Sequence, residues 1–259
     1  MARRRFGERR IGHAGTLDPS ATGVLVVGIG NATRLLRFAT AGRKTYECDI
    51  VFGIVTNTLD AAGETVATHD MRLDPSGVAE AAAAFVGTIS QLPPMVSAVR
   101  VGGRRLHEIA RAGQTAAREP REVEVYRFDT RPTDDPLVYR TRVECGAGTY
   151  VRSLGADLGA ALGGGAHVRS LRRTRSGAFT VAEAAPVAEA VLREPAELVR
   201  DLGQIRLSGD ETARVRSGTR LRADRYEGSG PWALVDPDGI LVGVHERSGD
   251  RLRATVLPT

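Results

Sequence analysis

Alternating apolar and polar residues predict several β-strands in the middle of the chain. In KTYECDIVFGI (44–54), every second residue from Tyr46 to Phe52 is apolar or aromatic, which is the period of a strand. REVEVYRFD (121–129) and VYRTRVEC (138–145) are two further strand candidates. VLVVGIG (24–30) is an apolar run of strand length that could be buried on both faces.

Helical patterns separate these strands, and the pattern changes again after about residue 200. The alanine-rich PSGVAEAAAAFVG (75–87) predicts a helix closed by Gly87, and TYVRSLGADLGAALGGG (149–165) one that ends in glycines. HEIARAG (107–113) predicts a short helix stopped by Gly113, and ETARVRSG (211–218) another. WALVDPDGILVGVHER (232–247) and RLRATVLP (251–258) read as strands joined by turns, so residues 203–259 are expected to form a small β-rich domain after a larger one over 1–200.

The charge balance favours a polyanionic partner. The chain of 259 residues has a formal net charge of +5 and a pI of about 9.7. Lys44 is its single lysine, and arginine is well suited to phosphates and bases. Codon bias in a GC-rich genome explains most of the preference for arginine, but not the clustering of four arginines between 169 and 175.

Cysteine usage and hydropathy exclude several other classes. Cys48 and Cys145 are far apart and have no Cys-x-x-Cys or histidine cluster near them, so a structural zinc site is not expected and both are predicted to be reduced thiols. No apolar stretch reaches the roughly 18 residues of a membrane span, and no export signal follows the arginine-rich start. We therefore expect a soluble cytoplasmic protein.

The stretch GHAGTLDPSATG (12–23) contains an acid between a basic segment and an apolar run. Asp18 followed by Pro19 matches a helix N-cap, and from this stretch alone the cap is favoured over catalysis. A cap does not account for Gly12, Gly15 and Gly23, which indicate a sharply bent backbone that lets another group approach closely.

Motifs elsewhere are individually weak. The chain has no Walker loop, Gly-x-Gly-x-x-Gly helix start, His-Glu-x-x-His or Gly-x-Ser-x-Gly elbow. The candidates that remain are Asp18, Tyr46, Asp60, Tyr150 and Arg152. Each also has an ordinary structural reading, as a cap, a half-buried strand tyrosine, a turn residue or a surface residue.

Taken together, five ordered stretches resemble the bacterial TruB-type tRNA pseudouridine synthases over roughly residues 3–180. The resemblance is carried by the stretches GHAGTLDPSATGVLVVGIGNATRL, KTYECDIVFGIVTNTLDAAGE, QLPPMVSAVRVGGRRLHEIARAG, GTYVRSLGADLG and GAHVRSLRRTRSGAF. It implies an α+β pseudouridine synthase fold, with a mixed, mainly antiparallel sheet flanked by helices and a PUA-like carboxy-terminal domain. The family usually begins earlier, with a strand and a Lys-Pro-x-Gly block that is absent here, through either a late start codon or a true truncation.

The resemblance also implies a role for each candidate residue. Asp18 matches the acid required to break the bond between uracil and ribose, whether it attacks the sugar, attacks the base or assists loss of a C2′ proton. Tyr46 matches the aromatic that stacks on the flipped uracil and helps remove the C5 proton. Arg152 matches the arginine that pairs with the acid, and Asp60 the acid that pairs with that arginine. The remaining substrate-binding matches are His13, Tyr150 and Leu171.

The implied reaction is isomerisation of uridine 55 in the T-loop of tRNA, without metal or organic cofactor, by a monomer. Residues about 92–118 match an insertion that closes over the T-arm, and the carboxy-terminal domain is expected at the acceptor end. Two alternatives stay open: a catalytically impaired RNA-binding protein that helps tRNA fold, and a guide-RNA-dependent relative that acts on ribosomal RNA. The phosphate contacts expected from the arginine clusters are Arg100, Arg104, Arg105, Arg169, Arg172, Arg173 and Arg175.

Overall fold

The computed structural model describes residues 1–257, apart from the side chain of His107, and its contacts divide the chain into two compact units. The large-sheet unit contains Thr16–Val24 and Gly42–Ser176. The C-terminal unit contains Met1–Gly15, Leu25–Ala41 and the residues from Gly177 onward. Each unit has its own sheet and its own buried core.

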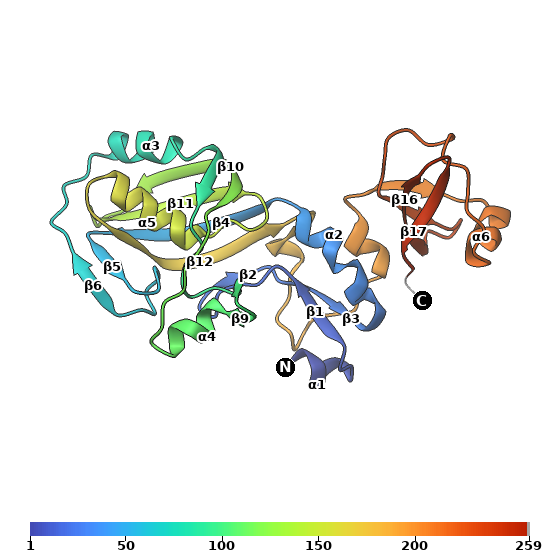
Figure 1. The fold of residues 1–259 in the computed structure, drawn as a ribbon, viewed down its shortest axis with the longest axis horizontal. Coiled ribbons are helices and arrows are strands. Elements are labelled where there is room, and N and C mark those ends of the chain that lie inside the picture. The colour runs from blue at the N-terminus through green and yellow to red at the C-terminus, as the bar shows by residue number, and fades with distance from the viewer. Residues whose placement is uncertain (258–259) are drawn as a thin grey trace. The chain divides into compact units, whose positions relative to one another are not determined.

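The large-sheet unit is built on a mixed, mainly antiparallel sheet, as predicted (Figure 1). Its five long strands follow one another in the order β12, β4, β11, β10 and β7, and each neighbouring pair is antiparallel. The short β2 (Thr22–Gly23) runs parallel to its neighbour β12. The long strands span β4 (Lys44–Phe52), β7 (Gly87–Gln91), β10 (Arg121–Pro132), β11 (Val138–Cys145) and β12 (Ala166–Ser176).

Two helices, α3 (Pro75–Ala83) and α5 (Val151–Ala161), cover one face of this sheet (Figure 1). Helix α3 starts where the Asp74 carboxylate accepts the Gly77 N–H at 2.9 Å, with Pro75 in the first turn. The alternation predicted for β4 places its apolar side chains in the core, together with Val78 of α3 and Leu154 and Leu158 of α5. These two predicted helices and all three predicted strands of this unit are confirmed.

Smaller elements project from the large sheet. The hairpin of β5 (Ile54–Thr56) and β6 (Thr65–Thr68) encloses the turn that contains Asp60. The predicted insertion contains β8 (Arg100–Val101), β9 (Arg104–Arg105) and the expected helix, α4 (Leu106–Arg111), which ends before Gly113.

The C-terminal unit contains a four-stranded sheet in the order β14 (Gly203–Arg206), β15 (Trp232–Val235), β16 (Leu241–Ser248) and β17 (Arg251–Val256). Strand β15 is buried on both faces: Trp232 and Leu234 pack into one apolar cluster, and Ala233 and Val235 into another. The β-rich character predicted for this region is confirmed, whereas its likeness to PUA modules stays a prediction. The unit also contains α1 (Ala2–Phe6), β1 (Ile11–Ala14), β3 (Val26–Ile29), η1 (Gly30–Leu35), α2 (Leu36–Ala41), β13 (Phe179–Thr180), η2 (Val181–Glu183), η3 (Pro195–Val199) and α6 (Gly209–Arg216).

The C-terminal unit takes in residues from before position 200, since Leu35 and Val199 share a buried cluster with Val235 of the C-terminal sheet. The domain boundary near residue 200 stays a prediction. The run VLVVGIG is not buried on both faces, since β3 pairs with β1 alone and leaves Val27 38% exposed. Within residues 1–257, no helix is long and apolar enough to cross a membrane.

Candidate active site

Asp18 and Arg152 form a two-point ion pair in the large-sheet unit. The Arg152 Nε donates to Asp18 Oδ2 at 2.8 Å, and Nη2 donates to Oδ1 at 2.7 Å. The arginine side chain is 3% exposed, whereas the aspartate side chain is 29% exposed. A buried guanidinium therefore holds a carboxylate that still has access to the outside, which suits an acid that must remain ionised and reach a substrate.

Asp18 lies in a turn, and not at a helix N-cap. The Ala21 N–H donates to the Asp18 carbonyl at 2.9 Å, and Pro19 lies between them in the position that a β-turn favours. No helix follows, because residues 22–23 pair with β12 instead. The predicted cap is thus wrong, and the carboxylate is left free to bind Arg152.

Gly23 allows this loop to lie directly against β12. It has a φ of +97°, and a Cβ built on it would lie 2.1 Å from the Arg173 carbonyl oxygen. The Val24 N–H donates to that same oxygen at 2.8 Å. The glycines of this stretch predicted that another group approaches the backbone closely. At Gly23 this group is the backbone of Arg173 in β12.

The remaining bonds of Arg152 come from two different loops. Its Nη1 donates to the Thr58 carbonyl and its Nη2 to the Val96 carbonyl, both at 2.8 Å. The Asp60 Oδ2 lies 3.7 Å from Nε, so the predicted Asp60–Arg152 ion pair is present as a longer contact. Thr58 and Val96 lie in two of the stretches that carry the family resemblance, but their carbonyls were not predicted as partners of Arg152.

The loop that carries Asp60 is held rigidly. The Asp60 Oδ1 accepts the Thr58 hydroxyl at 2.6 Å and the Ala62 N–H at 3.1 Å. Leu59 has a φ of +61° and is the one non-glycine residue with positive φ in the described part of the chain. The Val168 N–H of β12 donates to the Leu59 carbonyl at 3.1 Å, which fixes this strained turn beside the ion pair.

Tyr46 is buried on the core face of β4, directly opposite Arg173 of β12. Burial raises the pKa of the Tyr46 phenol. The Arg173 guanidinium, which hydrogen-bonds the phenol, lowers this pKa, and the negative charge of Asp18 raises it further. The phenol, the acid and two arginines are thus close enough to influence one another electrostatically.

Three other predicted residues have different surroundings. Tyr150 is the N-cap of α5, and Leu171 packs against the core next to β4. His13 lies exposed on β1 in the C-terminal unit, so its role in holding a nucleotide stays a prediction.

Most of the predicted phosphate contacts are exposed, but Arg173 is not. Its side chain is fully buried, and its Nε donates to the Val24 carbonyl at 2.8 Å. It is therefore corrected from a surface phosphate contact to a core residue behind Tyr46. The six others are exposed in the large-sheet unit: Arg100, Arg104, Arg105, Arg169, Arg172 and Arg175.

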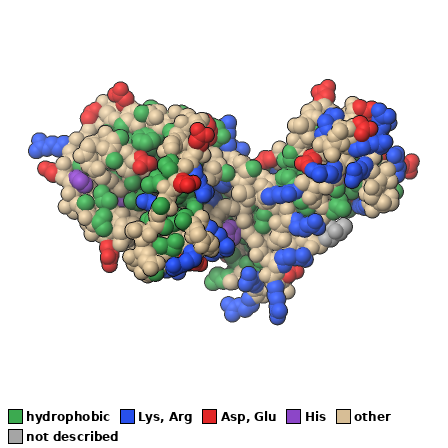
Figure 2. Space-filling model, in the orientation of Figure 1, with side chains coloured by type: hydrophobic (Ala, Val, Ile, Leu, Met, Phe, Trp, Pro, Cys, Tyr) green, Lys and Arg blue, Asp and Glu red, His purple; other side chains and the backbone are tan. Residues whose placement is uncertain are grey.

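Basic side chains also cover parts of the C-terminal unit. In Figure 2, arginines gather around helix α1 and over the C-terminal sheet. The arginines of α1 are Arg3, Arg4 and Arg5. These clusters give this unit a surface suited to an anionic partner.

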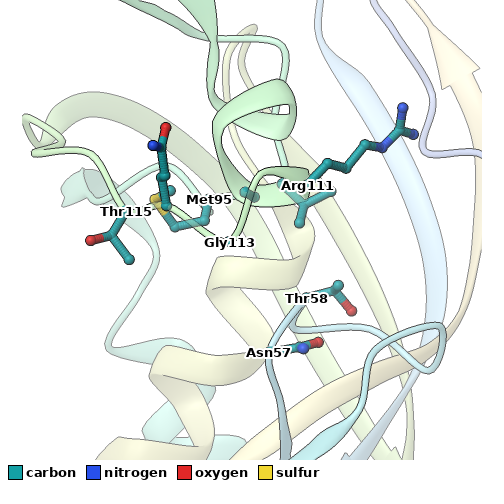
Figure 3. Close-up of a pocket in the computed structure, with 9 residues that line it drawn as sticks. Asn57, Thr58, Met95, Arg111, Gly113 and Thr115 are labelled. Carbon is teal, nitrogen blue, oxygen red and sulfur yellow. The ribbon is translucent and has the colours of Figure 1, made fainter.

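A pocket of about 480 Å³ separates the insertion from the loop that precedes Asp60 (Figure 3). Asn57 and Thr58 line one side, and Met95, Val96 and the end of α4 line the other. The Arg111 side chain extends away from Asn57 and Thr58. Because the Thr58 and Val96 carbonyls both bind Arg152, this pocket borders the ion pair.

The two cysteines are free and buried in this unit. Burial raises the pKa of the Cys48 thiol to about 12 and that of Cys145 to about 11. Neither thiol is therefore a ready nucleophile.

Comparisons with known proteins agree with this arrangement. Residues 3–151 match the TruB family pseudouridylate synthase N-terminal domain, and residues 152–205 match the tRNA pseudouridylate synthase B C-terminal domain. A protein named tRNA pseudouridine synthase B from Thermobifida fusca (strain YX) is 45% identical over 95% of this chain and 88% of its own length. One of the same name from Symbiobacterium thermophilum is 46% identical over 84% of this chain and 76% of its own length.

Solved structures show the same fold at lower identity. The chain matches one in the crystal structure of a Cbf5-Nop10-Gar1 complex with a TM-score of 0.73 and 22% identity, over 99% of this chain and 79% of that one. A chain from the structure of an H/ACA RNP bound to a substrate RNA containing 2′-deoxyuridine gives a TM-score of 0.72 at 20% identity, over 99% of this chain and 78% of that one. With the domain matches and the sequence relatives, these findings establish that the chain belongs to the TruB family of pseudouridylate synthases.

Proposed function

We propose that this chain converts uridine to pseudouridine in tRNA, at position 55 of the T-loop. The observation that carries the proposal is the Asp18–Arg152 pair, in which a partly exposed carboxylate is held at two points by a buried guanidinium. Relatives named tRNA pseudouridine synthase B support tRNA as the substrate over a guide-RNA-dependent reaction on ribosomal RNA.

In this proposal, a uridine leaves its helical stack and enters the site next to Asp18. The ionised Asp18 carboxylate drives cleavage of the bond between C1′ and N1, and the uracil rotates and rejoins the sugar through C5. Arg152 holds the carboxylate at two points and keeps it aimed during this step. The base stays in the site throughout, so the reaction is an isomerisation.

Tyr46 then contributes to loss of the C5 proton. Because burial raises the pKa of this phenol, it is protonated in the free enzyme at neutral pH. The phenol oxygen accepts the C5 proton as the phenol passes its own proton to solvent water. The neighbouring Arg173 guanidinium stabilises the negative charge that develops on the oxygen. Tyr46 also offers an aromatic surface that replaces the stacking lost by the flipped base.

RNA binding is assigned to the exposed arginines of both units. In this proposal, phosphates are neutralised by the exposed Arg100, Arg104 and Arg105 of the insertion and by Arg169 and Arg172 of β12. The closing of the insertion over the T-arm, the monomeric state and the contact of the C-terminal unit with the acceptor end are parts of the same proposal.

The test is tritium release from a T-arm RNA that contains [5-³H]uridine. We expect release with the wild-type chain, no release with Asp18→Asn, and wild-type release with Asp129→Asn, which removes a surface acid paired with Arg127. Release that survives in Asp18→Asn would remove Asp18 from the mechanism. RNA binding by the wild type without release would replace the proposal with an RNA-folding role.

A further inference from the structure

Gln91 is a polar residue at a core-facing position of β7. In this strand Thr88 and Ser90 are exposed, whereas Ile89 packs against the core and Gln91 is only 2% exposed. The alternation alone would place an apolar side chain at position 91. A buried amide costs free energy unless its donors and acceptor are bonded, so its partners indicate why it is there.

Both polar atoms of this amide bind the backbone of one residue, Tyr150. The Gln91 Nε2 donates to the Tyr150 carbonyl at 3.1 Å, and the Tyr150 N–H donates to Gln91 Oε1 at 2.8 Å. The Tyr150 carbonyl also accepts the Leu154 N–H at 3.1 Å, which is the first helical bond of α5. Gln91 thus fixes the point at which α5 begins, two residues before Arg152.

Residues that follow Gln91 bind the same helical turn. The Ser153 hydroxyl donates to the Leu92 carbonyl at 3.1 Å, and Arg152 Nη2 donates to the Val96 carbonyl at 2.8 Å. Gln91 and the first residues of the insertion, 92–96, therefore contact three of the first four residues from the N-cap of α5. These contacts hold the turn that carries Arg152, whose guanidinium donates to both Asp18 oxygens.

We propose that Gln91 is a positioning residue of the pseudouridylation site, which holds the Arg152 guanidinium against Asp18 through Tyr150 and the first turn of α5. The tritium-release measurement that tests this role rests on the function proposed above. Gln91 itself touches no reacting atom. A shift of about 1 Å in a positioned group can cost about 100-fold in rate, so this support has a measurable effect on the chemical step.

The test compares single-turnover tritium release at saturating T-arm RNA for Gln91→Met, Gln91→Glu and the wild type. Methionine has a similar volume and makes neither bond, so we expect a rate at least about tenfold lower per folded protein, with RNA Kd changed less than about twofold. Glutamate keeps the acceptor for the Tyr150 N–H and loses the donor, so its rate is expected to lie between the two.

Thr141→Val is the matched control, since Thr141 is equally buried in β11 and its hydroxyl donates to the Tyr139 carbonyl at 3.3 Å, away from α5 in the chain. It should lower Tm and leave the rate unchanged. If Gln91→Met gives too little folded protein, Ser153→Ala, which removes the bond to Leu92, is expected to lower the rate in the same direction. Wild-type rates in Gln91→Met, or in both Gln91→Glu and Ser153→Ala, would overturn the proposal.

A second readout does not depend on activity. The Arg152 Nε–H, identified in ¹⁵N-arginine spectra by its loss in Arg152→Lys, should exchange with solvent faster in Gln91→Met than in the wild type. Unchanged exchange would contradict the positioning role. If the wild-type chain releases no tritium, the proposed function fails, whereas the exchange measurement still decides the role of Gln91.

Discussion

A Cβ atom on Gly23 would lie 2.1 Å from the carbonyl oxygen of Arg173, well inside contact distance. This glycine therefore sets how closely the loop that carries Asp18 can approach β12. The Val24 N–H bonds the same oxygen, so the loop and the strand are joined at the point of closest approach. The position of the acid depends on this contact between backbones.

Gly23→Ala is expected to displace the Asp18 loop. The neighbouring atoms are backbone and cannot move aside, so the loop must shift, and we expect tritium release to fall by about 100-fold. Gly163→Ala is the control: Gly163 also has a positive φ of +81°, but a Cβ there meets nothing within 4 Å. It should cost about 1 kcal/mol of stability and leave the rate unchanged. Equal rates for the two variants would show that the close approach does not position Asp18.

Arg152→Lys tests whether the two-point geometry matters beyond the charge. A lysine ammonium cannot bond both Asp18 oxygens and the Thr58 and Val96 carbonyls at once, so we expect a rate about 100-fold lower and a free energy of unfolding lower by about 2–3 kcal/mol. The measurements are single-turnover tritium release and urea denaturation.

Arg169→Lys provides the comparison for that variant. Arg169 pairs with Asp49 at 3.1 Å with half its side chain exposed, so the same change there should alter stability by less than about 1 kcal/mol. Full activity in Arg152→Lys would show that a positive charge alone is sufficient next to Asp18.

The strands and helices of the large-sheet unit could be predicted because their patterns are regular. Tyr46 to Phe52 alternate along β4, and the helix at 151–161 ends just before the run of three glycines at 163–165. The helix at 75–83 ends earlier than the pattern indicates, because Gly87 begins a strand instead of closing the helix. The sequence pattern therefore predicts the existence of an element more accurately than the residue at which it ends.

The site was predictable only in part, because much of it is backbone. Asp18, Arg152 and Asp60 were expected together from the family resemblance, and they meet. The Thr58 and Val96 carbonyls could not be predicted as partners of Arg152 from the sequence, since every residue has a backbone carbonyl. Gln91 did leave a signal, a polar residue in the apolar register of β7, but β7 itself was not predicted.

Arg172 and Arg173 are adjacent in sequence and are predicted to differ in function. Arg172 is exposed, so Arg172→Ala should weaken T-arm RNA binding and reduce the slope of log Kd against log salt by about 1. Arg173 is buried and bonds the Val24 carbonyl, so Arg173→Met should lower the free energy of unfolding by about 2–4 kcal/mol.

The two arginine variants are compared by RNA titration at several salt concentrations and by urea denaturation. If Arg173→Met is stably folded and its log Kd depends less steeply on log salt, Arg173 does contact RNA phosphates. If Arg172→Ala leaves that slope unchanged, Arg172 does not contact them.

His245 is expected to make the C-terminal sheet less stable in mild acid. It is 5% exposed in β16, and burial lowers its pKa below the ordinary value of 6.5, with a smaller opposing effect from a backbone hydrogen bond to Gly243. As the pH falls below about 6.5, the unfolded chain binds a proton at this residue and the folded chain does not. The free energy of unfolding should therefore decrease from about pH 7 until the folded pKa is reached, and then level off.

Trp232 provides the measurement, because it is the single tryptophan of the chain and lies opposite His245 in the neighbouring strand β15. Thermal unfolding followed by its fluorescence should give a Tm that falls between pH 7 and pH 5. The fall should be smaller in His245→Gln, which cannot titrate in this range, and unchanged in His13→Gln, whose histidine is exposed on β1. Parallel pH profiles for the wild type and His245→Gln would show that another group causes the acid sensitivity of this sheet.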